Sequence, residues 1–461
     1  MVSIGFVYFC SVIKNNYELQ NDGTMKNILS KRTFIVLPLF LFSLHPLWGQ
    51  KSNFKNDICI PVKLYMLSDI RNDVFVEALI KRWRPYNDFV RFSGDCVYSR
   101  KLNRVASVDT PVDGSNMKIE LVNSDEFETI KEKAISICVG KKGIGTQEVT
   151  VQILGDSFVN GAFFRDALLS KNYIPGIKLV GLRNIKNEEG QYDEGRGGWT
   201  VKKYFEIPKG EMTSYHGYMQ PVGEYRYWGS CEFWKNCYKV INGELTDTEI
   251  VYNCGRYDQC ITKFDKETGY LAAPKKNDLM YDNARGSYMV YTGKKWKNVE
   301  VDERKWAFNY RKYLDMWNLD APKFFAQMLG LNDYRDSLTA DYREWNKKIA
   351  EMKESYYKAV PDGKFIILIP CTTCGSLNNI RGDFTLRQNA SMWQLRKNII
   401  DTFDGRESEG YYVVDIGITI DNEKGYNRNR DGIQTGNPHP YPNYPTMGIP
   451  LAAFIQYYRE L

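Results

Sequence analysis

The feature that most constrains this chain is a series of short, almost wholly apolar runs from residue 146 onward, separated by amphipathic stretches. Apolar runs of this length without polar alternation are typical of strands that are buried on both faces. The intervening stretches, such as 341–360 and 387–403, repeat apolar residues every three or four positions, which indicates helices. We therefore predict an α/β fold with a parallel sheet that helices cover on both faces. The predicted strands are 149–154, 177–183, 324–330, 364–370 and 411–417.

Composition divides the chain into three parts. Residues 1–50 hold a basic segment and an apolar stretch that begin near Met25, which is typical of a secretory signal peptide with Met25 as the expected true start. Residues 51–145 contain short alternating runs between turn-forming residues, which predict a small all-β sandwich accessory domain. Residues 146–461 form the predicted α/β domain. Within it, 201–303 lacks a βα pattern and is rich in cysteine and aromatic residues, so we interpret it as an insertion.

Charge and targeting narrow the classes of function. The leader predicts an exported protein, which is periplasmic, bound at the cell surface or secreted. The formal net charge is only +6 and the charged residues are evenly spread, so we expect no nucleic-acid partner. After the leader, no apolar run is long enough for a transmembrane helix. His, Cys and Asp do not cluster at ligand spacings and no glycine-rich phosphate loop is present, so we expect no metal and no cofactor.

Two features of the insertion each allow two interpretations. Its four cysteines could form two disulfides in an oxidising compartment, whereas their spacing is poor for the alternative, a structural zinc site. Its aromatic residues either form the core of this lobe or present a platform on which sugar rings stack. The cysteines are Cys231, Cys237, Cys254 and Cys260. The aromatic residues are Tyr215, Tyr218, Tyr225, Tyr227, Trp228, Phe233, Trp234 and Tyr238.

Four short blocks combine residues that can carry chemistry with positions just after a strand or in the terminal loop. Ser157 follows the first strand in a Gly-Asp-Ser turn, and Gly198 lies in a glycine turn after the second strand. Asn332 follows the third strand, and His439 precedes the C-terminal helix. Active sites of such sheets lie at the carboxyl ends of the strands. We therefore expect these four residues to meet there.

A serine hydroxyl becomes an effective nucleophile only when an adjacent base takes its proton. The chain has three histidines, and His45 lies in the leader. His216 lies inside the insertion, where we expect a surface or substrate-contacting role. His439 lies on a loop that follows the last strand and leads into a helix, so it can return to the strand ends. We expect His439 to be the general base for Ser157.

The chain resembles the SGNH (GDSL-like) hydrolase superfamily, in its exported bacterial branch with an N-terminal β-sandwich. The resemblance lies in the order of four blocks and in their positions relative to the strands: GDSFVNG, EGRGGWT, MLGLND and HPYPNYPTMGIPLAAF. The resemblance implies a flavodoxin-like three-layer α/β/α domain with a five-stranded parallel sheet, and a carboxylic ester hydrolase. It also implies an oxyanion hole made by the backbone N–H groups of Ser157 and Gly198 and the side-chain amide of Asn332. Gly197 is an alternative to Gly198, and a helix N-cap is the alternative role for Asn332.

The chain departs from the family pattern at the catalytic acid. The family usually has a carboxylate three positions before the histidine, where it orients the imidazole. Gly436 occupies that position here. We expect Asp431 to serve instead, and the alternatives are Asp415, Asp421 or a Ser–His dyad without an acid.

These features are consistent with three functions. The leading hypothesis is an exported serine esterase that removes acyl groups, in particular acetyl groups, from a carbohydrate or polysaccharide. A lipase-like or thioesterase-like hydrolase would instead need an apolar groove for a longer acyl chain. A catalytically inactive carbohydrate-binding surface protein would keep the fold without turnover, and the glycine at position 436 favours this third hypothesis.

Overall fold

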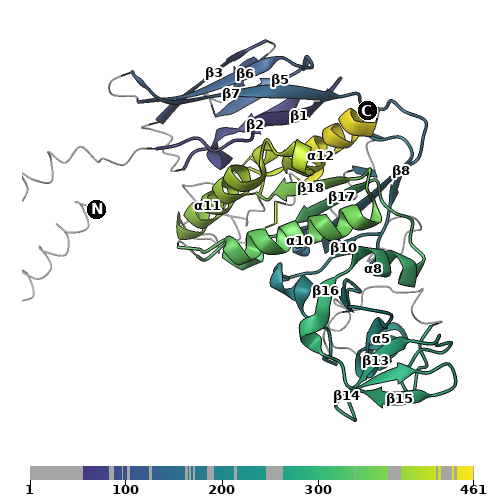
Figure 1. The fold of residues 1–461 in the computed structure, drawn as a ribbon. Helices are drawn as coiled ribbons and strands as arrows, with labels where there is room; N and C mark the ends of the chain where they lie inside the picture. The colour runs from purple at the N-terminus through teal and green to yellow at the C-terminus, as the bar shows by residue number, and fades with distance from the viewer. Residues whose placement is uncertain are drawn as a thin grey trace, which may run out of the picture. The chain divides into compact units, whose positions relative to one another are not determined.

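Figure 1 shows the computed structural model of the protein, which describes residues 56–459 with several gaps. The predicted leader, residues 1–50, lies outside the described residues. No described helix has the length and apolar content that a membrane span requires. Asn56–Leu461 form one compact unit. The gaps are 82–87, 96, 101–103, 124–126, 161–164, 166–167, 170–171, 184–191, 212–214, 246–262, 338, 372–385, 422–423, 427–438 and 441–443.

A parallel sheet forms the centre of the molecule. Strands β9 and β10 pair with one edge of β8, and β17, β18 and β19 follow in that order on its other edge. All of these pairings are parallel, and the order is that of flavodoxin-like sheets, 2-1-3-4-5. The strands are β8 (Val149–Gly155), β9 (Ile177–Leu179), β10 (Glu194–Gly195), β17 (Phe324–Met328), β18 (Lys364–Ile369) and β19 (Tyr411–Asp415).

The described sheet thus has six strands, one more than the five that the apolar runs predict. The additional strand, β10, has only two residues and no apolar run that could have revealed it. Glu194 and Gly195 pair with Leu154 and Gly155 at the very end of β8. This short pairing brings the segment that follows β10 next to the segment that follows β8.

Helices cover both faces of this sheet. Neighbouring residues of a strand point to opposite faces. On β17, the ring of Phe324 contacts Phe454 of α12, with ring centroids 6.2 Å apart, whereas Phe325 contacts Tyr356 of α10 at 5.4 Å. Helices α12 and α10 therefore lie on opposite sides. The helices near the sheet are α3 (Ser157–Asn160), α8 (Tyr310–Trp317), α9 (Leu331–Tyr334), α10 (Arg343–Ala359), α11 (Leu386–Phe403) and α12 (Tyr444–Arg459).

The strands before the central sheet form two smaller sheets with a common core. One sheet has the order β1–β7–β6–β3 and the other the order β2–β5–β4. Side chains of both sheets, such as Leu64, Val90 and Val108, belong to one apolar cluster, which Ile418 joins from beyond β19. The strands are β1 (Lys63–Leu67), β2 (Asn72–Phe75), β3 (Asp88–Gly94), β4 (Val97–Arg100), β5 (Val105–Val108), β6 (Asn116–Asn123) and β7 (Thr129–Gly140).

This N-terminal module packs directly on α12, which Figure 1 shows between the module and the central sheet. The rings of Tyr65 and Phe454 lie 4.9 Å apart at this contact. Gly140, the last residue of β7, lies so close to α12 that a Cβ atom there would be 2.2 Å from the carbonyl oxygen of Ala453. The helix that follows His439 is therefore held by the N-terminal module as well as by the central sheet.

The predicted insertion forms a lobe with its own four-stranded sheet, in the order β12–β13–β14–β15. A short strand at its start, β11, pairs antiparallel with β16, which follows the insertion. The elements are η2 (Lys202–Phe205), β11 (Met219–Pro221), β12 (Arg226–Ser230), α5 (Cys231–Ile241), β13 (Asp278–Asp282), β14 (Ser287–Tyr291), β15 (Trp296–Val299), η3 (Glu303–Lys305) and β16 (Trp306–Phe308).

Aromatic side chains form the core of this lobe, so the alternative of a sugar-stacking platform is not supported. Tyr225 and Tyr238 are partly buried, and the other predicted aromatic residues are buried. Cys231 is a buried free thiol, so the interpretation in which all four cysteines form two disulfides is wrong. Cys254 and Cys260 lie outside the described residues.

Replacing Gly140 by alanine should destabilise the protein, because its Cβ would overlap the backbone of α12. Overpacking of this kind costs about 1–3 kcal/mol in the free energy of unfolding. Urea denaturation would measure the loss. Ser136→Ala on the same strand, at a partly exposed position, is the control and should change stability by less than about 0.5 kcal/mol. Equal stabilities of the two variants would contradict the close contact.

Candidate active site

Ser157 begins α3 immediately after β8 ends, so its side chain lies at the carboxyl edge of the central sheet. The carboxylate of Asp156 fixes this turn by accepting a hydrogen bond from the backbone N–H of Phe158, at 3.0 Å. Asp156 is completely buried, and burial raises the pKa of its carboxyl group to about 7. The serine therefore projects from a rigid turn, as a nucleophile requires.

His439 lies beside this serine, with its Nε2 atom 2.9 Å from Ser157 Oγ. Its ring packs against Phe158, at a centroid distance of 4.9 Å. Burial lowers the pKa of His439 to about 4, and the positive charge of Arg335 also lowers it. The imidazole is consequently neutral at neutral pH. In the tautomer that carries its hydrogen on Nδ1, Nε2 can accept the hydroxyl proton.

The acid that would orient this imidazole stays a prediction, because Asp431 lies outside the described residues. The alternative acid Asp415 already has a partner for each carboxylate oxygen. Both oxygens accept hydrogen bonds from Arg396, one of them at 3.0 Å, in a fully buried ion pair. Asp421 accepts a hydrogen bond from the backbone N–H of Lys424 at 3.1 Å. The structure therefore argues against Asp415.

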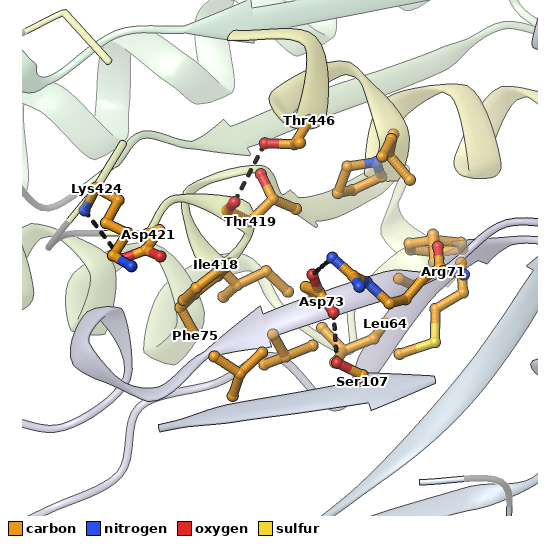
Figure 2. Close-up of a pocket in the computed structure, with 17 residues that line it drawn as sticks. Leu64, Arg71, Asp73, Phe75, Ser107, Ile418, Thr419, Asp421, Lys424 and Thr446 are labelled. Atoms are coloured by element: carbon orange, nitrogen blue, oxygen red, sulfur yellow. Dashed lines mark hydrogen bonds and ion pairs between the residues drawn. The ribbon is translucent and has the colours of Figure 1, made fainter. Parts of the chain in front are cut away.

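Asp421 lines a separate cavity of about 490 Å³ between the N-terminal strands and α12. Figure 2 shows Asp421 and Lys424 on one side of it and the ion pair of Arg71 with Asp73 (2.9 Å) on the other. The lining contains none of the four site residues that the structure describes. In the described part of the chain, no group of three or more His, Cys, Asp or Glu side chains could hold a metal ion.

Gly198 lies in a tight turn beside the nucleophile. The N–H of Trp199 donates to the carbonyl of Arg196 at 3.2 Å and closes the turn, and the N–H of Arg196 donates to the carbonyl of Gly155 at 2.8 Å. Gly198 has φ = +72°, a conformation that favours glycine, whereas Gly197 does not have a positive φ. No atom lies within 4 Å of the place where a Cβ of Gly198 would be, so the turn faces open space.

Asn332 connects this turn to the nucleophile. Its amide nitrogen donates to Asp156 Oδ2 at 3.2 Å and to the carbonyl of Trp199 at 3.1 Å. The N-cap of α9 is Gly330, so the alternative role of Asn332 as an N-cap is wrong. These two contacts engage both amide hydrogens, so Asn332 must exchange one of them to bind an oxyanion.

The structure thus brings together Ser157, His439, Gly198 and Asn332, and their catalytic roles stay predictions. The expected surface or substrate-contacting role of His216 is wrong, since its side chain is buried. Its Nδ1 accepts from the N–H of Tyr218 at 3.2 Å, its Nε2 lies 3.1 Å from the carbonyl of Glu206, and burial lowers its pKa to about 3.

Arg335 is a residue of this site that the sequence analysis missed. It follows Asn332 by three positions, which places the two on the same side of a helical turn. Its positive charge acts on both His439 and Asp156 and lowers the pKa of each. The three-residue spacing from Asn332 was the signal that could have identified it.

Comparisons with known proteins yield low similarity. No protein-family model and no curated protein matches this chain. Among solved structures, a family 3 carbohydrate esterase from Talaromyces cellulolyticus is 12% identical, covers 68% of this chain and 99% of its own, and has a TM-score of 0.30. A family 3 carbohydrate esterase from Clostridium thermocellum is 10% identical, with coverages of 65% and 93% and a TM-score of 0.28. A peptidoglycan O-acetylesterase is 11% identical, with coverages of 67% and 91% and a TM-score of 0.28. TM-scores this low assign neither a fold nor a function to the chain.

The pKa of His439 can be measured without any assumption about activity. NMR titration of the imidazole signals should give a midpoint near pH 4 for His439. Arg335→Gln should raise this pKa, because it removes the positive charge that disfavours the imidazolium. The control is Arg343→Gln, whose guanidinium is almost fully exposed and paired with Asp341. A His439 midpoint near 6.5 in the parent protein, or equal midpoints in both variants, would contradict this electrostatic description.

Proposed function

We propose that this chain is an exported serine esterase that removes acetyl groups from an acylated carbohydrate. The observation that carries the proposal is the 2.9 Å contact between His439 Nε2 and Ser157 Oγ at the carboxyl edge of the parallel sheet. A neutral histidine beside a serine on a tight strand-to-helix turn is the arrangement that activates a hydroxyl nucleophile. The resemblance of the four sequence blocks to SGNH hydrolases supports the same chemistry.

In the proposed reaction, Ser157 Oγ attacks the acyl carbonyl carbon while His439 Nε2 takes the hydroxyl proton. The electron pair of the carbonyl double bond moves to its oxygen, which the N–H groups of Ser157 and Gly198 and the amide of Asn332 stabilise. When this intermediate collapses, the sugar oxygen leaves with the proton from His439. Water then attacks the acyl-serine in the same way, with His439 again as base, and releases the carboxylic acid.

The proposed substrate class rests on features outside the Ser157–His439 pair. The leader and the N-terminal β module are consistent with an exported enzyme that acts on polymers, and the resemblance implies acetylated carbohydrate. The aromatic residues of the insertion no longer support carbohydrate binding, because most of them are buried. The length of the preferred acyl chain separates this proposal from the lipase-like alternative.

Ser157→Ala and His439→Ala should each reduce kcat for hydrolysis of p-nitrophenyl acetate by about 10³-fold or more, because the nucleophile and its base act as one unit. The double variant should lose little beyond either single variant. Release of p-nitrophenol by the purified protein measures the rate, and circular dichroism verifies folding. Ser136→Ala, at a partly exposed position on β7 of the N-terminal module, should keep kcat within about twofold.

Two outcomes would overturn the esterase chemistry, and a third would overturn the preference for acetyl groups. Equal activity in the parent and in Ser157→Ala would remove Ser157 as the nucleophile. A folded parent protein that hydrolyses no acetyl ester, either of p-nitrophenol or of O-acetylated xylan fragments, would favour the carbohydrate-binding alternative. Faster hydrolysis of octanoyl than of acetyl esters would favour a lipase-like enzyme.

A further inference from the structure

A buried ion pair lies directly behind the glycine turn of the site. The side chains of Glu194 and Arg196 are both completely buried, and Arg196 donates to Glu194 Oε2 at 2.6 Å. Glu194 also accepts, on Oε1, the N–H of Leu182 at 2.7 Å and the hydroxyl of Tyr313 at 2.6 Å. Burying two charges is costly unless good hydrogen bonds satisfy them, and removing one partner is strongly destabilising. Such a pair therefore has one well-defined geometry.

The guanidinium of Arg196 also contacts the insertion. It donates to the carbonyl of Tyr215 at 3.1 Å. It also lies over two aromatic rings, 5.1 Å from the centroid of Trp199 and 5.7 Å from that of Tyr204. The glycine turn runs from Arg196 to Trp199. The side chain of its first residue, Arg196, therefore packs on the ring of its last residue, Trp199. The insertion thus contacts the turn in the folded structure, through Tyr215, and is not only next to it in the sequence.

The hydroxyl of Tyr204 joins the turn to the nucleophile strand. Its oxygen lies 2.7 Å from the carbonyl oxygen of Gly155 and 2.7 Å from that of Glu194, so its single hydrogen is shared between the ends of β8 and β10. Tyr204 is completely buried, and burial raises its pKa above the ordinary value, so the hydroxyl keeps its proton. The opposite side of the turn is anchored where the N–H of Val201 donates to the carboxylate of Asp333, at 3.0 Å.

We propose that Arg196, Glu194 and Tyr204 are positioning residues that set the Gly198 N–H for the oxyanion, and that the insertion supports this turn through Tyr215. The inference rests on the proposed esterase function, and it assigns to the insertion a role inside the catalytic machinery. None of the three residues touches the substrate in this description. They act by holding a backbone donor, and a displacement of about 1 Å at such a donor can cost about 10²-fold in rate.

The test is Tyr204→Phe, which removes the shared hydroxyl and keeps the ring. We expect kcat for p-nitrophenyl acetate to fall about 10- to 100-fold with KM within about twofold, because a transition-state contact is impaired and ground-state binding is not. The pH at which kcat/KM falls on the acid side should not move, because His439 is unaffected. Hydrogen exchange of the backbone amides of 195–199 should be faster than in the parent protein.

The matched control is Tyr310→Phe. Its hydroxyl is equally buried and donates to Gln152 at 2.8 Å, in the same aromatic cluster but without a described contact to the turn. It should leave kcat within about twofold and the exchange of 195–199 unchanged. Arg196→Lys, which keeps the charge but cannot reach two partners in the same way, should reproduce the kcat loss of Tyr204→Phe if the protein folds.

The outcomes separate this inference from the proposed function. If the parent protein hydrolyses esters and depends on Ser157, while Tyr204→Phe resembles Tyr310→Phe in kcat and in exchange, the positioning role is wrong and the esterase stands. If Tyr204→Phe loosens 195–199 but the parent protein hydrolyses no ester, the turn is positioned as described and the proposed function is wrong. Faster exchange together with the selective loss of kcat supports both.

Discussion

The site depends on the close approach of three backbone segments at the end of β8. Gly155 pairs in register with Gly195 of β10 on one side and with Met328 of β17 on the other. A Cβ at Gly155 would lie 2.9 Å from the carbonyl oxygen of Met328, and one at Gly195 would lie 2.1 Å from the backbone nitrogen of Asn160. Two residues without side chains therefore let three segments leave the sheet at one point. Those segments are the start of α3 with Ser157, the glycine turn, and α9 with Asn332.

Much of the fold could be predicted because buried parallel strands are almost wholly apolar, as 365–370 and 411–414 are. The meeting of Ser157 with His439 was also predictable, since the chain has few histidines and only one follows the last strand. Strand β10 could not be predicted, because two residues carry no periodicity. The burial of His216 depends on the tertiary packing of the insertion, which no local pattern encodes. The acid remains a prediction, since Asp431 lies outside the described residues.

Burial has opposite effects on the two titratable groups around the serine, and both effects favour the uncharged form. It raises the pKa of Asp156 to about 7 and lowers that of His439 to about 4. Near neutral pH the carboxyl group of Asp156 is therefore only partly ionised, and the imidazole of His439 is uncharged. In the proposed reaction, a negative charge that develops on the substrate oxygen would meet the oriented N–H groups of the oxyanion hole. The buried charges, Glu194 and Arg196, lie behind the turn and neutralise each other.

The packing of β7 on α12 has a consequence for how the protein can be divided. His439 lies on the segment that leads into α12, and the other side of that helix is covered by the N-terminal module through Tyr65 and Gly140. A fragment that starts at residue 146 would expose this apolar side of α12 and leave the histidine segment anchored at one end only. The strands that precede the α/β domain therefore support the histidine segment as well as the central sheet does, and both belong to the one compact unit Asn56–Leu461.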